Sequence, residues 1–103
     1  MKFEDYVKIR KKMFDSQPRN KETFDLLWAS NSLAGEVGEF ANIVKKIYRD
    51  HHGDKEKMKT ELLDELGDIM WYWLFVCDIL DIKPEAIFNY NVTKLRDRYN
   101  EQV

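Results

Sequence analysis

Apolar residues recur at steps of three and four along nearly the whole chain, and this spacing constrains the fold more than any other feature. The clearest run extends from Lys21 to about Arg49; its apolar positions are Phe24, Leu27, Trp28, Leu33, Val37, Phe40, Val44 and Ile47. Such steps place side chains on one face of an α-helix, whereas a half-buried strand requires alternation. The 103 residues include only four glycines and two prolines, which leaves little room for a loop-rich β fold. The sequence therefore predicts an all-α protein.

Turn-forming residues divide this helical pattern into about four helices. We expect them at about residues 3–15, 21–49, 55–80 and 84–100. Asp50–Asp54 separates the second helix from the third, and these two should pair as an antiparallel hairpin. Pro84 suits the first turn of the last helix. At this length we expect residues 1–103 to form a single domain.

Composition and charge exclude several classes of protein. A net charge of −2 and an isoelectric point near 5.7 give no basic surface for nucleic acid. The longest apolar run, Ile69–Cys77, is far shorter than the roughly 20 residues that span a bilayer. The N-terminus lacks the apolar stretch of a signal peptide, and the single cysteine fits a reducing compartment. We expect a cytoplasmic protein that binds neither nucleic acid nor membranes.

The run Ile69–Cys77 also bears on assembly, because it is apolar or aromatic on all sides of its helix. Such a helix should be buried almost completely. It can be the central helix of a single bundle, or it can lie partly in an interface between subunits. We favour the second interpretation, a homodimer or homotetramer, since symmetric homo-oligomers are common and the other helices are few.

Two similar acidic quartets lie within the predicted hairpin: Glu36-Val37-Gly38-Glu39 and Glu65-Leu66-Gly67-Asp68. Acids three residues apart share one helix face and repel each other by about 0.2–0.5 kcal/mol per pair. Glu36 and Glu39 lie 17 and 14 residues before Gly53, and Glu65 and Asp68 lie 12 and 15 residues after it. In an antiparallel hairpin the quartets are therefore nearly level. Four converging carboxylates suit Mg²⁺, which prefers oxygen ligands and often bridges to phosphates.

Each quartet contains a glycine, at a cost of about 1 kcal/mol in a helix interior. Gly38 and Gly67 project roughly 200° around the helix from the first acid of their quartets. We therefore expect them to face away from the carboxylates and to let another helix approach closely. Glu61 lies one turn before Glu65 and is a possible auxiliary metal ligand.

Other acidic sites fit the sequence less well. A di-iron bundle needs Glu-x-x-His pairs, but the only histidines, His51 and His52, are adjacent in the turn. An EF-hand loop starting at Asp50 would have Lys55 at the position that requires glycine. Zinc-ligand spacings, a Walker glycine loop and a nucleophile elbow are absent from the sequence.

The ordered set of motifs resembles the MazG-like all-α nucleoside triphosphate pyrophosphohydrolases. The family's Glu-x-x-Glu and Glu-x-x-Asp signatures correspond to the quartets within Gly35–Phe40 and Glu65–Tyr72, and Asn91–Tyr99 resembles its closing Asn-x-x-Lys-Leu-x-x-Arg-Tyr. Together these motifs cover most of the chain from Leu33 onward. The resemblance implies hydrolysis of nucleoside triphosphates to monophosphate and pyrophosphate, with Mg²⁺, or Mn²⁺, held by catalytic carboxylates. Those residues are Glu36, Glu39, Glu65 and Asp68. It does not indicate which glutamate would accept the proton of water.

The resemblance also suggests residues that contact the nucleotide. Asn91, Lys94 and Arg98 share one face of the last helix, and Lys46 lies two turns beyond Glu39 on the same face. We expect them near the phosphates; without the resemblance, a solvated basic surface would be the favoured interpretation. Tyr72, two turns beyond Glu65, and Trp28 are candidates for contact with the base or sugar, although Trp28 also fits a core position.

These observations favour an enzyme that removes unwanted nucleotides or adjusts nucleotide pools. Two alternatives stay open at this point. One is a catalytically silent helical module that binds nucleotide or a protein partner. The other is a structural helical dimer without a ligand, which so many uncompensated acids disfavour.

Overall fold

The computed structural model describes residues 1–16 and 23–99, and their regular structure is entirely helical. The helices are α1 (Phe3–Ser16), α2 (Thr23–Asp50), the 3₁₀ turn η1 (Lys55–Met58), α3 (Lys59–Ile79) and α4 (Pro84–Tyr99). The predicted all-α fold of four helices is confirmed. The third helix differs from the prediction in its first turn, which is 3₁₀ instead of α-helical.

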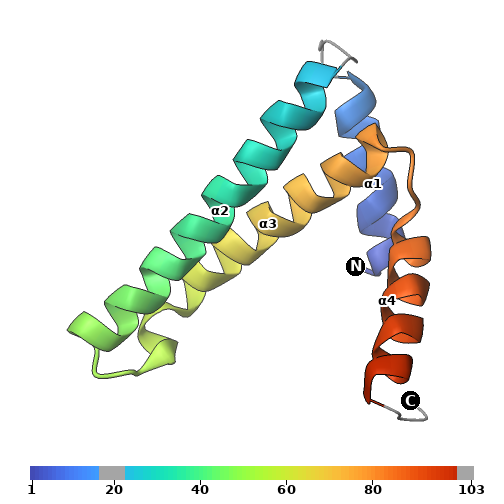
Figure 1. Cartoon of the computed structure of the whole chain (residues 1–103). Coiled ribbons are helices and arrows are strands. Elements are labelled where there is room, and N and C mark those ends of the chain that lie inside the picture. Colours follow the sequence, from blue (N-terminus) through green and yellow to red (C-terminus); the bar gives the residue numbers. More distant parts are fainter. Residues whose placement is uncertain (17–22, 100–103) are drawn as a thin grey trace.

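The antiparallel hairpin of α2 and α3 dominates the molecule, as Figure 1 shows. Backbone N–H groups of His51 and Gly53 donate to the Ile47 carbonyl, each at 3.0 Å, and close the end of α2. Gly53 has a φ of 79°, and a side chain there would approach the Tyr48 ring at 3.2 Å. Asp54 then accepts a hydrogen bond from the Glu56 backbone N–H at 3.2 Å and caps η1. The chain therefore reverses where the sequence predicts.

The second turn, between α3 and α4, separates the last helix from the hairpin. The Ile82 backbone N–H donates to the Cys77 carbonyl at 2.9 Å, and Asp81 has a φ of 54°. Pro84 starts α4, as predicted. α4 contains no buried residue, and Figure 1 shows it beyond the C-terminal end of α3. Its Phe88 ring stacks on Trp73, with centroids 6.1 Å apart.

The core lies where α1 meets the ends of α2 and α3. Phe14, Ala29 and Phe75 form its centre, one from each helix, and Val76 and Ile79 pack against them. The chain itself covers the apolar run of the third helix only in part: Leu74, Phe75 and Cys77 are buried, Met70 is 40% exposed, and the other five residues are half-buried. The prediction that Ile69–Cys77 lies partly in an interface between subunits stays a prediction, because one copy of the chain leaves most of the run half-buried or exposed.

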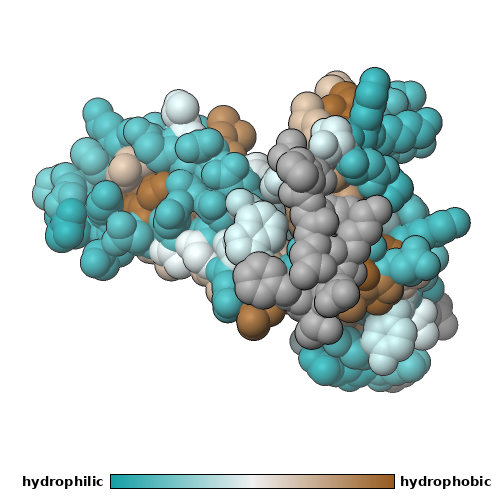
Figure 2. All heavy atoms as spheres, turned by 90° about the horizontal axis from the view of Figure 1, so that it is seen from above, coloured by the Kyte–Doolittle hydropathy of each residue, from teal (hydrophilic) through white to brown (hydrophobic). Residues whose placement is uncertain are grey.

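Apolar side chains nevertheless reach the surface elsewhere on α3. Leu63, Leu66 and Met70, here called the outer row, are 65%, 50% and 40% exposed. They lie at helical steps of three and four, about 100–160° around α3 from Glu65. Figure 2 shows apolar residues interrupting the polar surface on one face of the molecule. In the part of the chain that the structure describes, no helix combines the length and hydropathy needed to cross a bilayer.

Candidate metal and nucleotide site

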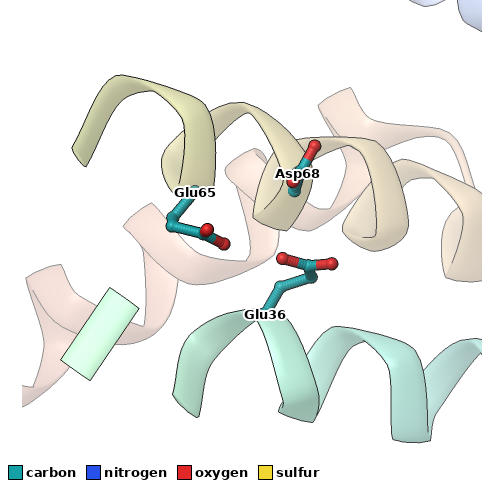
Figure 3. Close-up of side chains that lie close together, drawn as sticks. All are labelled: Glu36, Glu65 and Asp68. Carbon is teal, nitrogen blue, oxygen red and sulfur yellow. The ribbon is translucent and has the colours of Figure 1, made fainter. Parts of the chain in front are cut away.

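Three carboxylates meet between the two helices of the hairpin. Glu36 comes from α2, and Glu65 and Asp68 come from successive turns of α3 (Figure 3). One oxygen of each lies within 4.8 Å of the others, and all three side chains are half-buried. The level placement predicted from the turn explains why residues so far apart in sequence converge. We call Glu36, Glu65 and Asp68 the three-carboxylate cluster.

The fourth predicted ligand, Glu39, is exposed and lies outside this cluster. It is still close enough to raise the pKa of Glu65 by hydrogen bonding and by charge repulsion. The structure thus brings three of the four predicted acids together, with Glu39 beside them. Glu61 is exposed and is not part of the cluster, so its predicted auxiliary role has no geometric support here.

The pKa of Glu65 rises from an ordinary 4.5 to about 7. The largest cause is Glu36, whose carboxylate can accept a hydrogen bond from the protonated form of Glu65. The loss of water around Glu65 raises the pKa further, and so does the nearby carboxylate of Glu39. Glu36 Oε2 and Glu65 Oε2 are both inaccessible to solvent, and no N–H or O–H group of the described residues other than a proton on the carboxylates themselves donates a hydrogen bond to them. Without a cation, the crowding of these carboxylates therefore favours a proton shared within the Glu36–Glu65 pair.

This arrangement fits a hard divalent cation. Buried carboxylate oxygens without donors are costly unless a positive charge compensates them. Among the described residues, no lysine or arginine forms an ion pair with the cluster or with Glu39. Oxygen ligands from carboxylates suit Mg²⁺ or Mn²⁺, whereas zinc and copper sites usually include nitrogen or sulfur ligands.

The predicted phosphate-binding residues are not near the cluster of the same chain. Asn91, Lys94 and Arg98 are exposed on α4, which Figure 1 places away from the middle of the hairpin. Lys46 is half-buried near the turn end of α2, close to Asp50, whose pKa is lowered mainly by its hydrogen bond with Arg49 and also by the charge of Lys46. One copy of the chain therefore places its acids and most of its candidate cations on separate parts of the fold.

The two predicted aromatic contacts do come together. The rings of Trp28 and Tyr72 meet edge to face with centroids 5.8 Å apart, and Trp28 is 45% exposed. Tyr72 lies one helical turn beyond Asp68, so this pair adjoins the cluster along α3. Sequence reasoning missed Phe75, whose ring centroid lies 5.5 Å from that of Trp28 and 6.5 Å from that of Tyr72. Its position within an unbroken apolar run gave no signal for this role.

The prediction that Gly38 and Gly67 let another helix approach closely is not met within one copy of the chain. A Cβ at Gly38 or Gly67 would meet no other atom within 4 Å, so neither glycine admits a close helix of the same chain. Both positions border open space instead.

Comparisons with known proteins place this chain in a family. The MazG nucleotide pyrophosphohydrolase domain matches residues 23–103, which include both acidic quartets and α4. The chain belongs to this family. It is also 38% identical to the gene 37 protein of Mycobacterium phage L5 over 79 residues, which is 76% of this chain and 69% of that protein. No solved structure is significantly similar to this chain. The resemblance inferred from the motifs is therefore confirmed, and α1 precedes the matched region.

Proposed function

We propose that this MazG-family protein hydrolyses nucleoside triphosphates, ribo- or deoxyribo-, to monophosphate and pyrophosphate. The observation that carries the proposal is the three-carboxylate cluster, with oxygens within 4.8 Å between α2 and α3 and inside the matched region. Because triphosphates belong to the nucleotide pool of the cell, we assign the activity to the cytoplasm, in removing unwanted nucleotides.

Glu36, Glu65 and Asp68 would hold Mg²⁺ in this proposal. The bound metal would neutralise phosphate charge and acidify a water molecule. Glu39 is exposed beside the cluster, so its carboxylate is available to accept the proton of the attacking water. The proton held near Glu65 has to leave before this residue can act as a ligand, since a metal binds the ionised carboxylate.

The aromatic pair would contact the variable end of the substrate. Trp28 presents an exposed ring, and Tyr72 holds it edge to face next to the cluster. A base can stack on such a ring, because every base has an aromatic face. The phosphates would then extend from this pair towards the carboxylates.

A second copy of the chain would complete the site. The triphosphate needs cations, yet Lys94 and Arg98 lie with the neutral Asn91 on α4, apart from the cluster of their own chain. The outer row leaves three large apolar side chains exposed on α3. We infer that residues 1–103 assemble as a homodimer or homotetramer that covers the outer row and brings α4 of one copy to the cluster of another.

The proposed function is tested by measuring products. Purified protein is incubated with a panel of canonical and modified nucleoside triphosphates and Mg²⁺, and monophosphate and pyrophosphate are quantified. Equal amounts of the two products support the proposal. Release of orthophosphate together with a nucleoside diphosphate would refute it. So would the absence of turnover with every triphosphate tested.

A further inference from the structure

The first helix carries a buried arginine that the proposed chemistry does not use. Arg10 has 1% of its surface exposed, and its guanidinium forms an ion pair with Asp78 near the end of α3. Burial lowers the pKa of this guanidinium. Arginine is almost never fully buried unless paired, and a buried pair often stabilises a fold no better than apolar residues of similar size. Stability alone is therefore a weak reason for this charge.

The guanidinium also contacts three aromatic rings. Its central carbon lies 5.5 Å from the ring centroid of Phe14, 5.7 Å from Trp71 and 5.9 Å from Phe75. A planar guanidinium stacks on aromatic faces, which the compact ammonium of lysine does less well. Because Asp78 pairs with Nη2 of the guanidinium, the position of Arg10 limits the movement of these rings.

Phe75 links this buried group to the candidate substrate site. Its ring lies 4.1 Å from Phe14 on one side, and 5.5 and 6.5 Å from Trp28 and Tyr72. Trp28 and Tyr72 are the rings proposed to contact the base. Rings packed at these distances shift together, since a close-packed interior transmits displacement. The placement of the exposed Trp28 ring thus depends on contacts made by α1.

We propose that Arg10 is a positioning residue for base recognition: with Asp78 it holds Phe75, and through Phe75 it sets the Trp28–Tyr72 pair against which the base of the nucleotide binds. This inference rests on the proposed hydrolysis of nucleoside triphosphates. It assigns part of the substrate selectivity to α1, which precedes the residues 23–103 that the MazG domain matches.

Two variants test the inference. Arg10→Lys keeps a charge for Asp78 but loses the planar contact with the rings. Arg10→Met combined with Asp78→Asn removes both charges and leaves no unpaired buried ion. Lys11→Met is the matched control, because Lys11 is the next residue of α1 and its side chain is 56% exposed. Turnover of triphosphates with different bases is measured for each, together with the affinity for pyrophosphate in the presence of Mg²⁺.

We expect both Arg10 variants to raise KM by about fivefold or more and to change the ranking among bases, with kcat changed by less than about twofold. Their affinity for pyrophosphate, which has no base, should equal that of the wild type. Lys11→Met should change none of these values. Equal loss for every base, or weaker pyrophosphate binding, would overturn the inference.

Two further results separate this inference from the proposed function. Normal wild-type turnover with unchanged KM and base ranking in both variants refutes the role of Arg10 alone. A wild-type protein without turnover refutes the proposed function and, with it, the inference. If both variants lose their helical circular dichroism, the ion pair maintains the fold, and the positioning role is also refuted.

Discussion

At the scale of single residues, the carboxylates between α2 and α3 dominate the electrostatics of the protein. Glu36 and Glu65 each bury an oxygen to which no described group other than the carboxylates themselves donates a hydrogen bond, and no cation of the described chain offsets them. Helical spacing predicts which acids share a face, and the turn predicts that the two faces are level. Neither signal predicts that Glu39 lies at the edge of the cluster, because the position of its carboxylate depends on side-chain rotamers.

The raised pKa of Glu65 predicts how the metal-free protein responds to pH. The folded protein holds a proton on Glu65 up to about pH 7, whereas the unfolded chain releases it near 4.5. Between these values the folded state binds more protons, so this group's contribution to stability is present below pH 4.5 and is lost as the pH rises through 7. Thermal unfolding in EDTA should show this decline in the wild type and a shallower one in Glu65→Gln. Identical pH profiles for the two proteins would contradict the assignment.

At the scale of the elements, most of the fold could be predicted, because its signals are local. Apolar spacing identifies the helices, and Asp50–Asp54 and Pro84 mark the two turns. The buried pair of Arg10 and Asp78 was missed. Arg10 lies at four-residue steps between Tyr6 and Phe14, on the face that packs inward, and this spacing was the available signal. The open space at Gly38 and Gly67 was not predictable, since it depends on where α1 and α4 pack.

The hairpin turn provides a test at this scale. Gly53→Ala should lower the free energy of unfolding by more than about 1 kcal/mol, because Gly53 has a φ of 79° and an added Cβ would approach Tyr48 at 3.2 Å. Gly35→Ala, in the interior of α2 with open space around it, should raise the same quantity by about 0.5–1 kcal/mol. Urea unfolding followed by circular dichroism measures both. A neutral Gly53→Ala would mean that the turn adopts another conformation.

At the scale of the whole molecule, one copy of the chain leaves the outer row exposed and α4 loosely attached. We expect light scattering at micromolar concentration to give at least twice the monomer mass of 12.4 kDa. Leu66→Lys, which places a charge in the outer row, should reduce that mass. Lys59→Ala, which changes an exposed residue of the same helix, should leave it unchanged. A wild-type protein that stays at 12.4 kDa would refute the assembly.

The shared site can be tested by mixing two inactive variants. Asp68→Asn disables the cluster, and Arg98→Ala disables the phosphate contact on α4. If α4 serves the neighbouring copy, a mixed dimer has one site with both defects and one intact site. An equal mixture that exchanges subunits freely should then recover about a quarter of wild-type activity. If α4 serves its own chain, each site keeps one defect and the mixture stays inactive, which would contradict assembly of the site between copies.

The central claim, that the three-carboxylate cluster binds Mg²⁺ and thereby hydrolyses nucleoside triphosphates, is tested most directly by comparing pyrophosphate release from the wild type and from Asp68→Asn. The wild type should require Mg²⁺ or Mn²⁺ and stop in EDTA. Asp68→Asn should lose about 100-fold or more of this activity while its melting temperature stays equal or rises slightly, because one like-charge repulsion is removed. Glu61→Gln, which changes an exposed acid outside the cluster, should retain wild-type activity. Undiminished hydrolysis by folded Asp68→Asn, or by the wild type in EDTA, would contradict the account.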